Sequence, residues 1–106
     1  MTGDTLISRT SSHTHGNEVD LIVAREFLHP TARVLIIDDF LATGLTITSL
    51  IQLVHMAGAT PVGIGALIEK DFEGGRARLI RYYLPIYALA HVISMDGDKI
   101  QIVEEL

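Results

Sequence analysis

The sequence predicts an α/β fold built on a parallel β-sheet, and three observations lead to this prediction. Short apolar runs alternate with a clear amphipathic helical pattern along 106 residues, a length that fits one domain over residues 1–106. The run Val34–Ile37 is apolar at every position, which is typical of a strand buried on both faces of a parallel sheet. Apolar residues make up 48% of the chain and charged residues 20%, which is a globular composition.

A polar stretch precedes the first predicted strand. Residues 1–18 hold few apolar side chains, so we expect a mobile loop there. Residues 19–24 are rich in Val, Leu and Ile and predict a strand, which Pro30 and its neighbours would end. Residues 34–37 form the second predicted strand, and it ends at Asp38-Asp39.

One helix has a clear sequence signature. Its apolar residues recur at i, i+3, i+4 and i+7, at Ile47, Leu50, Ile51 and Val54. Gly58 is expected to cap its C-terminus, because glycine readily adopts the left-handed conformation found there.

The C-terminal part continues the alternation. Residues 61–68 predict a buried strand, and residues 76–83 a short helix with Leu79, Ile80 and Tyr83 facing inward. Residues 87–94 and 99–104 predict two further strands, joined by a turn at Asp96-Gly97-Asp98. The sequence therefore predicts a parallel sheet with an antiparallel edge.

Composition excludes several classes of function. The net charge is -5 without a basic cluster, so we expect no nucleic-acid partner. The absence of cysteine excludes disulfide frameworks and Cys-based zinc sites. No apolar run approaches the roughly 20 residues of a membrane helix, and the first residues lack a signal-peptide pattern. We therefore expect a cytoplasmic protein with no membrane partner.

The segment after the second predicted strand suits an anion. Asp38 and Asp39 stand at a strand's carboxyl end, where open α/β sheets bind ligands. The following loop leads into a helix N-terminus, whose dipole favours negative charge. Gly44 lets the backbone approach a ligand, while Thr43 and Thr46 offer hydroxyl donors. The loop has neither the Gly-Lys-Ser/Thr ending of a P-loop nor GxGxxG, which disfavours ATP and dinucleotides.

Two carboxylates beside a phosphate site need a partner of their own. Alone they would repel the phosphate, but they can accept hydrogen bonds from a ribose diol. A nearby Mg²⁺ would offset their charge. A sugar phosphate therefore fits both halves of the segment.

These residues match the motif of a known family. The segment Val34-Leu-Ile-Ile-Asp-Asp-Phe-Leu-Ala-Thr-Gly-Leu-Thr46 resembles the phosphoribosyl pyrophosphate (PRPP) motif of type I phosphoribosyltransferases. Phe40-Leu41 and the segment Gly63–Phe72 are similar to the xanthine phosphoribosyltransferase group. The resemblance covers residues 5–106 and implies a parallel-sheet, Rossmann-like type I phosphoribosyltransferase core.

The resemblance implies a role for each site residue. Asp38 and Asp39 would be catalytic and hold the ribose hydroxyls of PRPP, with Mg²⁺ beside them and no other metal. The 5-phosphate would be bound by Ala42, Thr43, Gly44, Leu45 and Thr46. Lys70 would contact the exocyclic oxygen of a purine, and Phe72 would lie near the base. Residues 8–18 would match the loop that closes over pyrophosphate.

The implied reaction transfers the 5-phosphoribosyl group from PRPP to a purine base, xanthine first, in purine salvage. Family members are commonly dimers and carry a further half before this region. We therefore expect the C-terminal, PRPP-binding half, truncated at the N-terminus, acting as a homodimer or with the missing N-terminal segment. The alternatives are a non-catalytic PRPP-binding module of a purine-responsive regulator and an inactive fragment.

Structural interpretations of the same residues stay open at this stage. Glu69-Lys70 can be a simple exposed pair at the end of a strand, worth little to stability. Phe72 can be a core residue, and His91 is expected to be structural.

Overall fold

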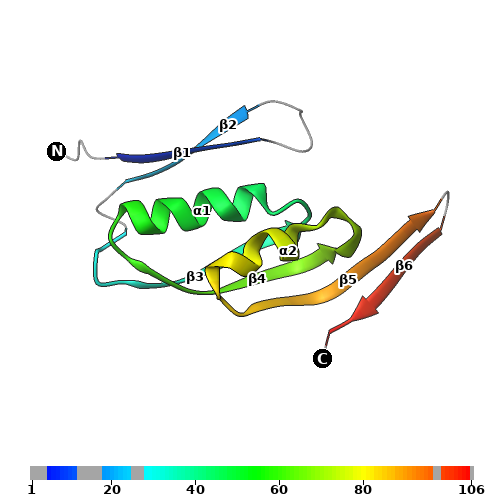
Figure 1. Ribbon diagram of the computed structural model, residues 1–106. Coiled ribbons are helices and arrows are strands. Elements are labelled where there is room, and N and C mark those ends of the chain that lie inside the picture. Colours follow the sequence, from blue (N-terminus) through cyan, green and yellow to red (C-terminus); the bar gives the residue numbers. More distant parts are fainter. Residues whose placement is uncertain (1–4, 12–17, 25–27, 97–98, 106) are drawn as a thin grey trace. The chain divides into compact units, whose positions relative to one another are not determined.

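The computed structural model describes residues 5–11, 18–24, 28–96 and 99–105 (Figure 1). Strands and helices alternate over most of this range, which confirms the predicted α/β fold with parallel strands. The elements in chain order are β1 (Thr5–Ser11), β2 (Glu18–Ala24), β3 (Arg33–Leu41), α1 (Leu45–Met56), β4 (Thr60–Lys70), η2 (Asp71–Glu73), α2 (Gly75–Leu79), η3 (Ile80–Tyr82), β5 (Ile86–Asp96) and β6 (Lys99–Glu104).

The larger sheet has the strand order β3-β4-β5-β6. Strand β4 pairs with β5 in parallel, from Ile64 opposite Ile86 to Lys70 opposite Val92. Strand β6 runs antiparallel to β5 at the edge, as predicted. The predicted turn at residues 96–98 lies largely outside the described residues. Within those residues, no helix combines the length and apolarity that crossing a membrane requires.

The chain divides into two compact units. The first consists of Met1–Ile36 and Leu45–Val62, and the second of Ile37–Gly44 and Gly63–Leu106. The boundary crosses β3 and β4, so both strands contribute backbone to both units.

The first unit contains the hairpin of β1 and β2, which pair antiparallel from Thr5 opposite Ala24 onward. The expected loop over residues 1–18 is therefore wrong for Thr5–Ser11, while residues 12–17 lie outside the described residues. Leu6 and Ser8 are buried and Ile7 is exposed, the alternation of a strand with one covered face. Strand β1 contacts α1, where the hydroxyl of Ser8 donates to Oε1 of Gln52 at 2.9 Å.

Helix α1 follows its predicted pattern. Its buried apolar residues are Ile47, Ile51, Leu53 and Val54. Gly58 has φ +77° and its N–H donates to the His55 carbonyl, while the Ala59 N–H donates to the Val54 carbonyl. This pair of bonds is the Schellman motif and confirms the predicted cap.

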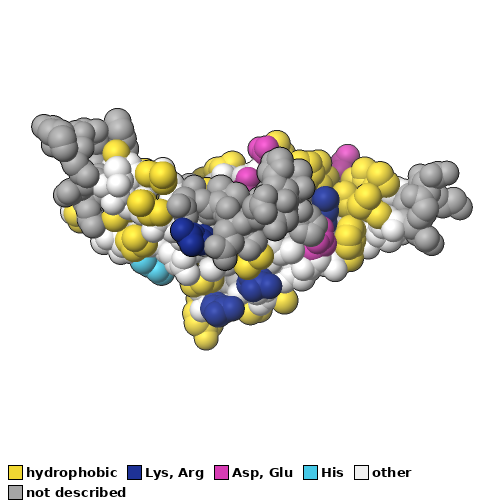
Figure 2. All heavy atoms as spheres, turned by 90° about the horizontal axis from the view of Figure 1, so that it is seen from above, with side chains coloured by type: hydrophobic (Ala, Val, Ile, Leu, Met, Phe, Trp, Pro, Cys, Tyr) yellow, Lys and Arg dark blue, Asp and Glu magenta, His cyan; other side chains and the backbone are white. Residues whose placement is uncertain are grey.

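The second unit has one buried and one exposed sheet face. Its buried apolar residues are Leu41, Ile64, Ala66, Leu79, Ala88 and Val92. On the other face, Leu67 and Leu89 are exposed, and Ile37 is 62% exposed beside Gly65. The expectation that Val34–Ile37 is buried on both faces is therefore wrong: within the described residues only one face of β3 is covered, and Leu35 is 59% exposed. Apolar side chains are also prominent on the face seen in Figure 2.

The short helical stretch also differs from its prediction. Helix α2 ends at Leu79, which is fully buried, and a 3₁₀ turn follows. Ile80 and Tyr83 are exposed rather than inward-facing, because the chain changes to a 3₁₀ turn at Ile80 and Tyr83 adopts φ +56°.

Candidate functional site

The acidic pair, Asp38 and Asp39, lies near the C-terminal end of β3. The Asp38 side chain is half-buried and Asp39 is exposed, and β3 continues beyond them to Leu41. The backbone N–H of Asp39 donates to Oδ1 of Asp38 at 2.8 Å. Burial raises the pKa of Asp38, the bond from Asp39 partly opposes this rise, and the neighbouring Asp39 charge adds to it. The two carboxylates therefore gain from a cation or hydrogen-bond donors nearby.

The loop Ala42–Gly44 joins β3 to α1, which begins at Leu45 and includes Thr46 in its first turn. Gly44 adopts φ +86°, a conformation that favours glycine. A Cβ at Gly44 would lie 3.1 Å from the carbonyl oxygen of Gly75. The left-handed turn and the close packing against Gly75 therefore both favour glycine at position 44.

Helix α2 holds this loop in place. A Cβ at Gly75 would overlap the Ala42 carbonyl oxygen and lie 3.0 Å from the Gly44 nitrogen. Nε of Arg78 donates to the Thr43 carbonyl at 2.8 Å. Sequence reasoning missed Gly75 and Arg78 as loop supports, and the Gly74-Gly75 pair was the one signal available.

The two predicted base-site residues lie at the end of β4. Lys70 is the last residue of that strand, and its Nζ lies 5.6 Å from the centroid of the Phe40 ring. Phe40 directly follows Asp39, so the structure brings Lys70 next to the strand that carries the acidic pair. Phe72 lies on η2 and is 51% exposed, so it is not a core residue.

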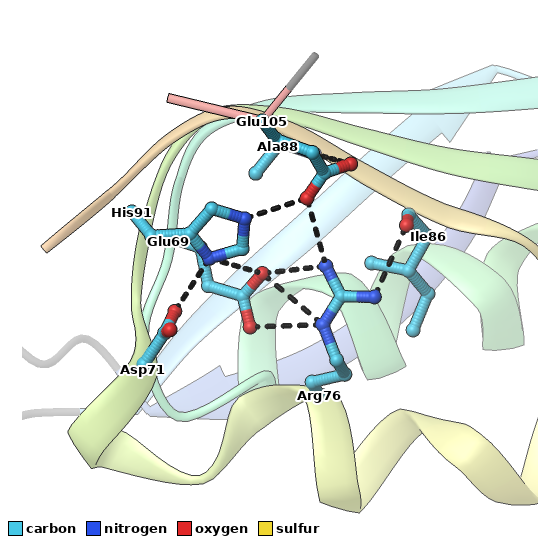
Figure 3. A network of polar contacts seen from close by, with 7 residues as sticks. All are labelled: Glu69, Asp71, Arg76, Ile86, Ala88, His91 and Glu105. Carbon is cyan, nitrogen blue, oxygen red and sulfur yellow. Dashed lines mark hydrogen bonds and ion pairs between the residues drawn. The ribbon is translucent and has the colours of Figure 1, made fainter. Parts of the chain in front are cut away.

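A network of charged side chains surrounds the residues on both sides of Lys70 (Figure 3). Glu69 is only 3% exposed, and Arg76 from α2 binds both of its oxygens, with Nη2 at 2.7 Å from Oε1. Arg76 Nη1 also donates to the Ile86 carbonyl at 3.1 Å. The reading of Glu69-Lys70 as an exposed pair is therefore wrong, because Glu69 is buried and its partner is Arg76.

His91 of β5 occupies the centre of the same network. Its Nδ1 lies 2.7 Å from Oδ1 of Asp71 and 3.5 Å from Glu69, and its Nε2 lies 2.6 Å from Oε1 of Glu105. The bonds to Asp71 and then Glu105 raise the pKa of His91, and the bond from His91 lowers the pKa of Glu105. The bond to Glu69 raises the pKa of Arg76 in the same way. This network could not be read from the sequence.

Among the described residues, two groups of side chains could hold a metal ion. The ligand atoms of Glu69, Asp71 and His91 lie within 4.8 Å of one another. However, the Arg76 guanidinium already bonds the carboxylate of Glu69, and both ring nitrogens of His91 bond carboxylates. We therefore interpret this cluster as an ion-pair network. The carboxylates of Asp38 and Asp39 are hard oxygen ligands of the kind that Mg²⁺ prefers.

Comparison with known proteins identifies the family. Residues 2–85 match the phosphoribosyl transferase domain. Xanthine phosphoribosyltransferase of Shouchella clausii is 48% identical over 98 residues, which cover 92% of this chain and 49% of that protein. Xanthine phosphoribosyltransferase of Deinococcus deserti is 38% identical over 104 residues, covering 98% of this chain and 54% of its own length.

Solved structures agree with this match. Adenine phosphoribosyltransferase from Rhodothermus marinus has a TM-score of 0.70 at 33% identity and covers 83% of this chain and 48% of its own. The enzyme of the same name from Thermoanaerobacter pseudethanolicus has a TM-score of 0.71 at 30% identity and covers 84% of this chain and 49% of its own. The chain thus spans about half the length of the relatives it matches. On the match over residues 2–85, it belongs to the phosphoribosyl transferase domain family.

Proposed function

We propose that this chain provides the PRPP-binding machinery of a purine phosphoribosyltransferase that acts in purine salvage on xanthine. The observation that carries the proposal is the continuous segment from Asp38 to Thr46. It places two acids, a glycine at φ +86° and a helix N-terminus in succession. No observation favours the alternative of a purine-responsive regulator, and the curated relatives are named as enzymes.

The chemical roles follow from charge and hydrogen-bonding capacity. Asp38 and Asp39 accept hydrogen bonds from the ribose 2- and 3-hydroxyls of PRPP. The loop Ala42–Gly44, with Leu45 and Thr46, binds the 5-phosphate through backbone N–H groups and hydroxyls. Mg²⁺ bound with PRPP beside Asp38 and Asp39 would neutralise phosphate charge, and the raised pKa of Asp38 is consistent with a carboxylate that gains from a nearby cation.

The reaction breaks the bond between C1 of PRPP and the pyrophosphate oxygen, and the electron pair leaves with pyrophosphate. A purine nitrogen forms the new bond to C1 with its lone pair, and the purine proton passes to the released pyrophosphate or to solvent. Positive charge develops on the ribose ring, and the carboxylates of Asp38 and Asp39 stabilise it.

Lys70 supports a 6-oxopurine as the base. An ammonium group only donates hydrogen bonds, so it pairs with an exocyclic oxygen and not with the amino group of adenine. The half-exposed ring of Phe72 provides an apolar surface near the base. Among 6-oxopurines, the names of the relatives from Shouchella clausii and Deinococcus deserti favour xanthine.

We extend the proposal to assembly and location. The exposed apolar face that includes Ile37, Leu67 and Leu89 supports association, as a homodimer or with a segment equivalent to the rest of the relatives. A cytoplasmic location fits an enzyme of purine salvage.

Calorimetric titration with PRPP and Mg²⁺ tests the PRPP site. Wild type should bind, and Asp38→Asn combined with Asp39→Asn should lose binding at least about tenfold, because charge-assisted bonds to the ribose disappear. Glu104→Gln removes an exposed carboxylate outside the site and serves as the control. Equal binding by wild type and the double variant would refute the site.

Measuring nucleotide formation tests which purine base the protein uses as substrate. Xanthine, hypoxanthine, guanine and adenine are each offered with PRPP and Mg²⁺, with the chain alone and with a segment equivalent to the other half of a relative. Xanthine is expected to react fastest and adenine slowest. A preference for adenine would contradict the role given to Lys70.

A further inference from the structure

An extensive polar network in the described residues includes both sequence neighbours of Lys70 but not Lys70 itself. Glu69 precedes Lys70 and Asp71 follows it, and both carboxylates are held by side chains from other elements (Figure 3). Lys70 itself has an extended backbone, with φ -93° and ψ 94°, between these two anchored neighbours. The direction in which its side chain leaves β4 therefore depends on how firmly Glu69 and Asp71 are held.

Arg76 provides the first anchor. Its planar guanidinium binds Glu69 through three contacts of 2.7 to 3.2 Å and the Ile86 carbonyl through a fourth. A guanidinium bound this way fixes the orientation of a carboxylate as well as its charge, which a lysine could not do. Arg76 thus ties the end of β4 to α2 and to the first residue of β5.

His91 provides the second anchor. It bridges Asp71 on η2 and Glu105 after β6, while Glu69 lies 3.5 Å from the same Nδ1. Its charged neighbours from the surrounding elements are therefore Asp71, Glu105, Glu69 and, through the carboxylates, Arg76. A ring with a carboxylate at each nitrogen holds its neighbours most firmly as an imidazolium, and the raised pKa of His91 agrees with this.

We propose that Arg76 and His91 are positioning residues, which orient Lys70 toward the purine base by fixing Glu69 and Asp71 on either side of it. The proposal rests on the function proposed above, since it takes Lys70 as the base-contacting group. A network that only stabilised the fold would not need to hold both neighbours of the same lysine. The position of Lys70 Nζ over the Phe40 ring gives a way to observe its orientation directly.

The chain has two lysines, Lys70 and Lys99, which makes a simple spectroscopic test feasible. Reductive methylation with ¹³C-formaldehyde labels both lysine amines, together with the terminal α-amine, and keeps their charge. The methyl signal of Lys70, assigned by its loss in Lys70→Arg, should be shifted by the ring current of Phe40. Arg76→Gln is expected to move this signal at least halfway toward its position in the urea-unfolded chain. A Lys70 signal that keeps its wild-type position in folded Arg76→Gln would overturn the proposal.

Matched variants separate positioning from folding. Arg81→Gln makes the same change at an exposed position on η3 and should leave the Lys70 signal in place. Arg76→Lys keeps the charge without the planar fork and should give an intermediate shift. If Arg76→Gln does not fold, Asp71→Asn decides, because Asp71 is 40% exposed and its loss leaves the Arg76–Glu69 pair intact. An Asp71→Asn variant with an unchanged Lys70 signal would then overturn the proposal.

Binding of two ligands links the position of Lys70 to the base. Xanthosine monophosphate carries base, ribose and phosphate, whereas ribose 5-phosphate lacks the base. Arg76→Gln and His91→Asn should weaken the first about tenfold, as misplacing a contact does, and leave the second within about twofold. Equal weakening of both would overturn the positioning role. Failure of wild type to bind either ligand would instead refute the proposed function, while the Lys70 signal still reports on positioning.

Discussion

Nζ of Lys70 lies 5.6 Å from the centroid of the Phe40 ring, within the range of a cation–π interaction. This contact joins the end of β4 to the residue that follows the acidic pair on β3. We predict that Phe40→Leu frees the Lys70 ammonium, whereas Phe40→Tyr keeps it over the ring. Both side chains are partly solvated, so the cost of Phe40→Leu in unfolding free energy should be about 1 kcal/mol or less.

The ¹³C-methyl signal of Lys70 checks this prediction. In Phe40→Leu it should approach its position in the urea-unfolded chain, and in Phe40→Tyr it should stay distinct from that position. Identical Lys70 signals in the wild type and Phe40→Leu would contradict the contact.

Two neighbouring glycines should respond differently to alanine. A Cβ at Gly75 would meet the Ala42 carbonyl oxygen, so Gly75→Ala must displace the loop and should cost about 1–3 kcal/mol through overpacking. At Gly74, φ is +79° but nothing lies within 4 Å of a Cβ, so Gly74→Ala should cost about 1 kcal/mol through backbone strain alone. We predict that Gly75→Ala also weakens PRPP binding and that Gly74→Ala does not.

Urea unfolding and calorimetric titration with PRPP measure the two effects separately. Equal loss of PRPP affinity in both variants would show that contact between α2 and the loop is not what supports the site.

Local sequence patterns predicted the elements whose formation depends on local bonds. The i, i+3, i+4 pattern and Gly58 predicted α1 and its cap, because both are completed within a few residues. Asp38, Asp39 and the loop up to Thr46 are contiguous, so the candidate PRPP segment could also be read directly.

Features that depend on distant residues were missed. Strand β1 looks polar in sequence, and its buried Ser8 has its partner in Gln52, which is 44 residues away in the sequence. The partners of Glu69 are Arg76 on α2 and His91 on β5, and Glu105, after β6, joins the network through these two residues. Their meeting depends on the register that places Glu69 opposite His91. Exposure of Leu35 and Ile37 was missed because an unbroken apolar run gives no sign of which face is covered.

The stability contributed by His91 should depend on pH. Its bonds to Asp71 and Glu105 raise its pKa above 6.5, so the folded chain retains the proton to a higher pH than the unfolded chain. This contribution is complete below the unfolded pKa and is lost as pH rises through the folded pKa. His91→Asn should therefore cost about 1 kcal/mol near pH 6 and progressively less in alkaline solution. Urea unfolding of both proteins across this range measures it, and a cost that does not change with pH would contradict the imidazolium bridge.

Asp38, unlike His91, should lower the stability of the fold in its ionised form. Burial raises the pKa of Asp38 above 3.8, so the folded chain holds this proton to a higher pH than the unfolded chain does. Ionised Asp38 therefore lowers stability at neutral pH, and this loss disappears as pH falls through the folded pKa. We predict that Asp38→Asn stabilises the chain at neutral pH, by less than about 1 kcal/mol because the side chain is partly solvated.

Thermal unfolding of wild type and Asp38→Asn at neutral and acidic pH measures this gain, which should vanish in acid. Asp39→Asn removes the adjacent exposed carboxylate and also relieves repulsion, so it should give a smaller gain. Both variants should lose PRPP affinity, because each removes a carboxylate proposed to accept bonds from the ribose. Residues that bind ligands are often retained at such a cost in stability. A destabilised Asp38→Asn at neutral pH would show that the Asp38 carboxylate is stabilised within the fold, and the need for a cation or ribose partner would then disappear.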